Sequence, residues 1–84
     1  MTYRVFILRR AQKEMNDLPA HVARRIAEEI RALSREPRPP GSMKLAGRGG
    51  WRIRSGDYRV VFDIDDKVQT VTVLHVGHRK DVYK

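Results

Sequence analysis

Arginine is the residue type that stands out for its chemistry, because three arginines fall within one candidate β-hairpin. Two alternating runs meet at Ser55 and Gly56, a pair that can form a two-residue hairpin turn. With that turn, Arg52 lies directly opposite Arg59, and Arg54 lies next to them on the same face. Like charges directly opposite each other destabilise a sheet, and guanidinium groups bind phosphate well. The pattern therefore predicts a site for an anionic ligand.

The same alternation gives the hairpin one apolar face and one charged face. The charged face carries a single acid, Asp57, which is predicted to lie opposite Arg54. A structural interpretation stays open, in which the arginine stems cover apolar neighbours while their heads remain in water. The apolar face must be covered by other elements, and it consists of Trp51, Ile53, Tyr58, Val60 and Phe62.

Helices are predicted in the first half of the chain, after a strand. Residues 2–8 form a strand that is apolar on both faces, which favours an interior position in a sheet. Apolar residues then recur at intervals of three and four, which predicts an amphipathic helix over residues 9–18 and a second over about 19–35. Prolines in residues 36–42 end the second helix and separate it from the sheet.

The second half of the chain is predicted to be a sheet. Residues 43–47 and 68–76 are strand candidates on either side of the hairpin, with a turn at 63–67. The length of that turn is open, so the core-facing set is either Val71, Val73 and His75 or Thr70, Thr72 and Leu74. The predicted fold class is α+β: an N-terminal strand, a two-helix hairpin and a mainly antiparallel sheet of about four strands, in a single domain over residues 1–84.

The segment after the last strand adds groups that suit an anion site. Gly77 places His78 and Arg79 at the rim of the sheet, and Tyr83 is close enough in sequence to fold back over the arginines. Phosphate contacts combined with aromatic stacking are how proteins hold single-stranded RNA. Structural alternatives remain, because Tyr83 can anchor the terminus and a lone surface histidine needs no catalytic role.

The composition limits partners and cofactors. Lys and Arg number 18 against 10 Asp and Glu, and the formal net charge of +8 indicates a nucleic acid, an anionic surface or an acidic protein as partner. Cysteine is absent and the histidines form no metal-binding pattern, so we expect no metal and no cofactor. No apolar run approaches the ~20 residues of a transmembrane helix, and the N-terminus lacks a signal-peptide pattern, so we expect a cytoplasmic protein without membrane association.

Two segments together resemble the RelE family of type II toxin–antitoxin toxins: residues 51–62 (WRIRSGDYRVVF) and residues 76–83 (VGHRKDVY). The resemblance extends over nearly the whole chain, including the order of strand, two helices and antiparallel sheet. It implies an endoribonuclease that cleaves messenger RNA, typically in the ribosomal decoding site. It also implies an acidic antitoxin as partner, and contact with operator DNA only through the antitoxin complex.

The family resemblance also implies roles for individual residues. Transferred position by position, the catalytic set is Arg52, Arg54, Arg59, Arg79 and Tyr83, with Lys44, Arg48 and Lys80 as RNA contacts. The implied reaction is attack of a ribose 2′-hydroxyl on the adjacent phosphate without a metal ion. Arginine, with a pKa above ~12, does not serve as a general base, so His78 or Tyr83 is the candidate for that role.

Two other functions fit the same sequence features. A ParE-like toxin resembles this fold but inhibits DNA gyrase and needs no nuclease residues. A non-catalytic RNA-binding module would use the arginines for phosphate contacts alone.

Overall fold

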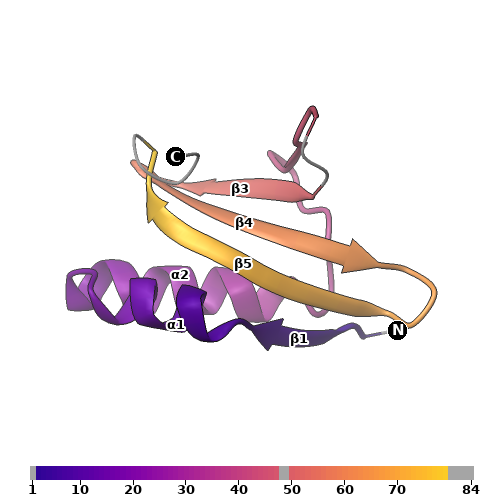
Figure 1. The fold of residues 1–84 in the computed structure, drawn as a ribbon, viewed down its shortest axis with the longest axis horizontal. Helices are drawn as coiled ribbons and strands as arrows, with labels where there is room; N and C mark the ends of the chain where they lie inside the picture. Colours follow the sequence, from indigo (N-terminus) through magenta and orange to yellow (C-terminus); the bar gives the residue numbers. More distant parts are fainter. Residues whose placement is uncertain (1, 48–49, 80–84) are drawn as a thin grey trace.

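Two helices and five strands form one α+β unit in the computed structural model, which describes residues 2–47 and 50–79 (Figure 1). The predicted fold class is confirmed, and the five strands correspond to the five strand candidates in the sequence. The elements follow in the order β1 (Arg4–Ile7), α1 (Arg9–Asn16), α2 (Ala20–Ala32), β2 (Met43–Lys44), β3 (Trp51–Ser55), β4 (Tyr58–Asp65) and β5 (Thr70–His78).

Both helices are shorter than the periodicity predicted. α1 ends at Asn16 instead of residue 18, because a proline at position 19 disfavours helical geometry at the residue before it. α2 ends at Ala32, and the next three amides bond to carbonyls three residues back, as in a tightened last turn. No helix in the described ranges 2–47 and 50–79 is long and apolar enough to cross a membrane.

The five strands form one sheet in the order β1-β5-β4-β3-β2. All neighbours are antiparallel except β1 and β5, which run parallel. The expectation of an interior position for the first strand is wrong, because β1 forms an edge of the sheet. Its side chains reflect that position: Phe6 and Ile7 remain 49% and 36% exposed.

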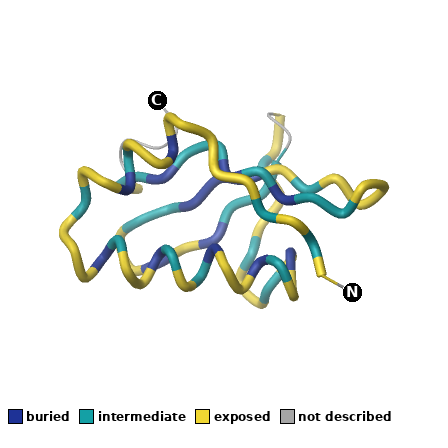
Figure 2. Tube along the Cα trace, turned by 90° about the horizontal axis from the view of Figure 1, so that it is seen from below, coloured by how far each residue is buried: buried dark blue, intermediate teal, exposed yellow. Residues whose placement is uncertain are grey.

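Both helices cover one face of the sheet, and the core fills the space between them (Figure 1). Figure 2 shows buried positions recurring along the helices and central strands, while the loops between elements are mostly exposed. We call the other side of the sheet, which neither α1 nor α2 covers, the open face. The core comprises Ala11, Met15, Val22, Ile26, Ile30 and Leu33 from the helical half and Ile53, Val60, Phe62, Val71, Val73 and Val76 from the sheet.

A β-bulge in β5 decides which of its residues reach the core. Phe62 pairs with Val73, whereas Val61 pairs with His75, so Leu74 is an extra residue in the ladder. Val73 and Val76 are therefore both buried although three positions separate them. Of the two alternatives from the sequence, the set containing Val71 and Val73 is right, but His75 is replaced in the core by Val76.

Candidate nucleic-acid interface

The turn between β3 and β4 consists of Gly56 and Asp57, one residue later than predicted. Gly56 has a φ of +61°, the left-handed value that a type II′ turn requires of its first residue, which favours glycine. Ser55 therefore belongs to β3 and pairs with Tyr58. Asp57 lies in the turn and does not lie opposite Arg54, so that prediction is wrong.

The changed register moves each residue of β3 by two positions along β4, and a shift of two keeps every side chain on its predicted face. Ile53 pairs with Val60 instead of Tyr58, and both point into the core. On the open face, Arg59 lies opposite Arg54, whereas Arg52 was predicted there. A directly opposed pair of arginines is thus present, but it consists of Arg54 and Arg59 instead of Arg52 and Arg59.

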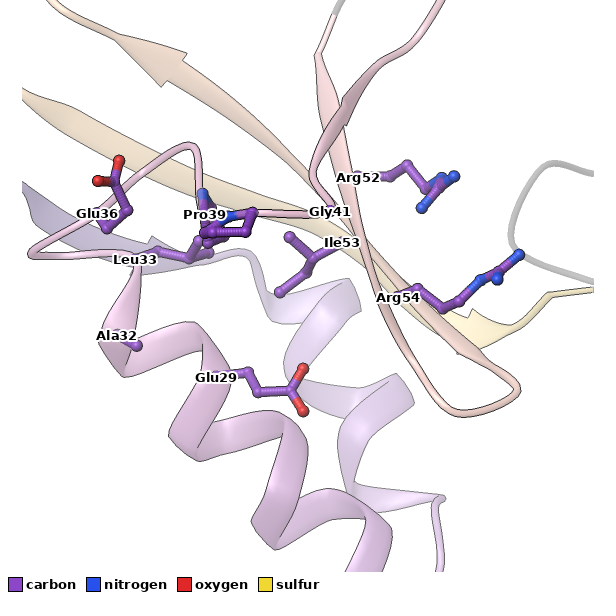
Figure 3. Close-up of a pocket in the computed structure, with 10 residues that line it drawn as sticks. Glu29, Ala32, Leu33, Glu36, Pro39, Gly41, Arg52, Ile53 and Arg54 are labelled. Carbon is purple, nitrogen blue, oxygen red and sulfur yellow. The ribbon is translucent and has the colours of Figure 1, made fainter.

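Four arginines gather at the hairpin end of the open face, and we call them the arginine cluster: Arg52, Arg54, Arg59 and Arg79. Figure 3 shows Arg52 and Arg54 pointing away from the side on which Ile53 meets the helices. The amide of Arg79 donates a hydrogen bond to the carbonyl of Asp57 at 2.8 Å, which continues the β4–β5 ladder. By strand alternation, Arg79 shares the open face with Arg59.

Arg59 occupies the centre of the cluster. It has Arg54 as its partner on β3 and Gly77 as its partner on β5, so no side chain stands beside it on the β5 side. Its Nη1 atom is buried, and no residue in the described part of the chain accepts a hydrogen bond from it. A buried guanidinium nitrogen without an acceptor is unusual in a folded protein.

Two other predicted site residues lie away from this cluster. His78 pairs with Tyr58 and meets its ring edge-on at 5.8 Å, on the sheet face that the helices cover. Lys44 pairs with Trp51, and its Nζ atom lies 5.8 Å from the centre of the indole ring. The expectation that His78 stands beside the arginines is therefore wrong, because alternation along β5 turns it to the opposite face from Arg79. Alternation likewise turns Lys44 to the face of the sheet opposite Arg52, because Lys44 pairs with Trp51 and its neighbour Met43 pairs with Arg52.

The remaining predicted site residues are Arg48, Lys80 and Tyr83. All three lie outside the described residues.

A part-buried polar network that the sequence analysis missed holds the hairpin to α2. Ser55 is 3% exposed, and its hydroxyl accepts a hydrogen bond from Nε of Arg25 at 2.8 Å and donates one to Oε1 of Glu29 at 2.9 Å. The network fixes the end of β3 next to Arg54. The signal in the sequence was a serine continuing the apolar alternation of Trp51 and Ile53, but the predicted turn removed Ser55 from the strand.

A groove of about 440 Å³ lies between the C-terminal half of α2, the proline-rich loop and β3 (Figure 3). Its walls combine apolar side chains with charged residues of both signs. Ile53 points into it, whereas the guanidinium groups of Arg52 and Arg54 extend past it toward the open face. The lining residues are Glu29, Ala32, Leu33, Glu36, Pro39, Pro40, Gly41, Arg52, Ile53 and Arg54.

A surface cluster holds the proline-rich loop in place. Arg38 binds both carboxylate oxygens of Asp66, at 3.2 and 2.8 Å, and its guanidinium lies 5.0 Å from the centre of the Trp51 ring. The hydroxyl of Tyr3 donates to the same carboxylate at 2.7 Å. The hydrogen bonds from Arg38 and Tyr3 lower the pKa of Asp66, while the bond to Asp66 raises the pKa of Tyr3.

The chemistry available at the open face is that of fixed positive charge. The arginine cluster can bind and orient a phosphate, and it can stabilise negative charge that develops on phosphate oxygens. Within residues 2–47 and 50–79, no group of three or more histidine, aspartate or glutamate side chains is arranged to hold a metal ion.

Comparisons with known proteins agree with this fold. Residues 5–83 match the sequence family described as the ParE toxin of the type II toxin–antitoxin system parDE. The chain is 34% identical to Toxin RelG of Mycobacterium tuberculosis, over 100% of this chain and 99% of that protein.

Solved structures give the same result. The RelBE2 toxin–antitoxin complex of M. tuberculosis contains a chain that is 32% identical, with a TM-score of 0.83, over 94% of this chain and 100% of that one. The archaeal RelE–RelB complex of Pyrococcus horikoshii gives 33% identity and a TM-score of 0.84, over 98% and 100%. This α+β chain, matched along almost its whole length by these toxins, belongs to the RelE/ParE family of type II toxin–antitoxin toxins.

Proposed function

We propose that this toxin is an endoribonuclease that cleaves messenger RNA, with the scissile phosphate held by the arginine cluster. The observation that supports this most directly is the buried Nη1 of Arg59, which lacks an acceptor in the described part of the chain. An unpaired buried donor is costly, and its cost is greater when the group is charged. The directly opposed Arg54 adds repulsion that an anion would relieve. A phosphate oxygen supplies both the missing acceptor and the missing charge.

The proposed reaction follows from what fixed cations can do. A ribose 2′-hydroxyl loses its proton to a base and attacks the adjacent phosphorus, and the bond from phosphorus to the 5′-oxygen breaks. The products are a 2′,3′-cyclic phosphate and a 5′-hydroxyl, which takes up a proton. Negative charge grows on the phosphate oxygens in the transition state, where preorganised arginines stabilise it most.

The proton transfers need a group other than arginine, whose guanidinium does not deprotonate in proteins. His78 is left out of this proposal, because its ring lies with Tyr58 on the opposite face of the sheet. Tyr83 is the remaining candidate for general base or acid.

The proposed setting is the cytoplasm, with the messenger RNA bound in the ribosome and with an acidic antitoxin that neutralises the toxin. The net charge of +8 favours both kinds of anionic partner. Solved complexes of RelE-type toxins with RelB-type antitoxins support a protein partner of that kind. Operator DNA would be contacted through the complex with the antitoxin.

The groove beside β3 is the proposed position for one antitoxin segment. β2 pairs with Trp51 and Arg52, and among residues 2–47 and 50–79 no other strand pairs with that side of β3. The carbonyl of Gly50 accepts a hydrogen bond from the amide of Leu45, and alternation turns the main-chain groups of Arg54 to the same edge. An extended segment pairing there would place apolar side chains in the groove and carboxylates near Arg52 and Arg54.

The nuclease proposal is tested by incubating the purified toxin with a defined messenger RNA, with and without ribosomes, in a buffer that contains the Mg²⁺ that intact ribosomes require. Cleavage that depends on ribosomes and leaves 5′-hydroxyl and 2′,3′-cyclic phosphate ends supports the proposal. Intact RNA under all conditions contradicts it.

A second candidate function is inhibition of DNA gyrase, which the match to the ParE toxin family favours. A supercoiling assay with purified gyrase separates the two. Loss of supercoiling with intact messenger RNA supports the gyrase interpretation.

A further inference from the structure

The open face of the sheet changes sign along β4. Along β4, Arg59, Val61, Asp63 and Asp65 alternate with residues that face the helices, so these four side chains follow one another on the open face, where Val61 is covered by its neighbours and only 7% exposed. At ~3.3 Å per residue, the backbone positions of Arg59 and Asp63 are about 13 Å apart. The hairpin end of this face is therefore cationic, and the end next to the β4–β5 turn is acidic.

Asp63 is an exposed acidic residue on the open face, near the turn end of β4. It is exposed, and within residues 2–47 and 50–79 no cation or hydrogen-bond donor engages its carboxylate. Its neighbour on β5 is Thr72, followed on β1 by Phe6, so its row across these strands contains no positive charge. On the β3 side, a methyl group added to Gly50 would lie only 3.0 Å from Oδ1, so the carboxylate leans over the backbone at the start of β3.

Asp65 continues the acidic end but has a structural role as well. Its Oδ1 atom accepts hydrogen bonds from the amides of Lys67 and Val68, at 3.0 and 3.3 Å, and so shapes the turn. Arg4 lies two strands away in the same row, where its guanidinium is 5.9 Å from the Phe6 ring. Asp63 is therefore the residue whose charge can be changed with little effect on the fold.

We propose that Asp63, supported by Asp65, sets a boundary that excludes the RNA backbone from the turn end of the open face. The single strand then crosses β3, β4 and β5 at the arginine cluster instead of running along the strands. This inference rests on the proposed RNA-binding function of the cluster. The Debye length is about 8 Å at physiological ionic strength, so a phosphate held at Arg59 escapes most of the repulsion from Asp63, whereas a phosphate over Val61 or beyond feels it.

The boundary also limits the number of phosphates in contact. Arg54 and Arg59 lie on neighbouring strands and Arg79 directly follows the next strand, at a spacing of ~4.8 Å between strands, so the cluster spans about 10 Å across the sheet. A lysine in place of Asp63 would remove the repulsion and extend the cationic track along β4. Each further phosphate contact on a single strand changes the slope of log K against log salt by about −0.7.

The test compares D63K with wild type in binding non-cleavable 2′-O-methyl RNA oligonucleotides of increasing length, over a series of salt concentrations. The matched control is E28K, which makes the same change of charge at an exposed position of α2. We expect D63K to bind long oligonucleotides more tightly, to steepen the salt slope by about 0.7 and to gain affinity over a longer range of lengths than wild type. E28K should keep the wild-type length dependence and slope.

Equal effects of D63K and E28K would mean that total charge matters and position does not, which overturns the boundary. An unchanged slope and length dependence in D63K overturns it as well. Wild-type protein that binds none of the oligonucleotides would instead overturn the RNA-binding function on which the inference rests. Circular dichroism confirms beforehand that both variants are folded.

Discussion

Arg54 and Arg59 lie directly opposite each other on β3 and β4, and both point to the open face of the sheet. A cross-strand pair of like charges lowers the stability of a sheet by up to about 1 kcal/mol. The chain retains the pair at the position where Gly77 leaves the β5 side of Arg59 open. Such an arrangement is expected where binding of an anion repays the electrostatic cost.

The first prediction concerns catalysis. Replacing Arg59 with alanine should lower the rate of messenger RNA cleavage by about a hundredfold or more, a loss of ~3 kcal/mol in transition-state stabilisation. The free energy of unfolding should change by less than about 1 kcal/mol, because a repulsive pair is removed. Cleavage rates and urea denaturation measure the two effects. R24A removes the same charge from an exposed position of α2 and should cleave normally. Unchanged cleavage by folded R59A would contradict the assignment.

The second prediction concerns the network that attaches the hairpin to α2. Ser55→Ala should lower the free energy of unfolding by about 1–3 kcal/mol, because the charged groups of Arg25 and Glu29 each lose a part-buried hydrogen bond to the hydroxyl. Urea denaturation measures this effect. Ser42→Ala, in the loop before β2, provides the control with the same chemical change. If the two variants are equally stable, Arg25 and Glu29 pair with each other without the hydroxyl.

The third prediction concerns acid stability. The pKa of Asp66 is lowered by hydrogen bonds from Arg38 and Tyr3, so its carboxylate favours the folded state. This contribution is present above the ordinary value of 3.8 and is lost as the pH falls through the lower value of the folded protein. Asp66→Asn should therefore be less stable than wild type at neutral pH, and the difference should shrink in strong acid.

The measurement is the urea midpoint of both proteins as a function of pH. Arg38→Gln removes the guanidinium whose hydrogen bonds do most to lower the pKa of Asp66, and it should reduce the pH dependence in the same direction. A constant difference between wild type and D66N down to the lowest pH would show that the charge of Asp66 contributes nothing.

The fourth prediction concerns the antitoxin. Ala32 is exposed and lines the groove, so Ala32→Trp should fill part of the groove without disturbing the core. We expect at least a tenfold loss of affinity for the acidic antitoxin, about 1.4 kcal/mol. Cleavage of messenger RNA should be retained. Calorimetry with the purified antitoxin measures the affinity.

Ala20→Trp makes the same change at an exposed position of α2 that does not line the groove, and it should bind the antitoxin normally. Full affinity of A32W would place the antitoxin elsewhere.

The faces of the hairpin were predictable from sequence because alternation depends only on the strand period. The register of the hairpin was not predictable, because Gly56 fits either position of a two-residue turn. The hydrogen bonds that hold Ser55 in β3 come from Arg25 and Glu29 of α2, which lie thirty and twenty-six residues earlier in the chain. The two-residue shift that resulted left the predicted faces intact. A shift of one residue would have reversed them.

The errors in the candidate site have a similar origin. Arg79 and His78 are neighbours in sequence, and alternation alone places them on opposite faces of the sheet without showing which residue lies on which face. Uninterrupted alternation from Val71 and Val73 would place Arg79 on the core face, and the bulge at Leu74 reverses this assignment. Charge and residue type identified the arginine cluster, whereas the partners of each residue required the sheet.

The parallel pairing of β1 with β5 affects how the toxin is made. The first strand of the sheet pairs with the last one. Residues 4–7 can therefore form this pairing only after residues 70–73 have left the ribosomal exit tunnel. Contacts so distant in sequence form late in folding. Arg79 follows β5, so a nascent or truncated chain cannot assemble the arginine cluster. The arginine cluster therefore forms only after most of the chain has been translated. During that time an antitoxin can already be present in the cell.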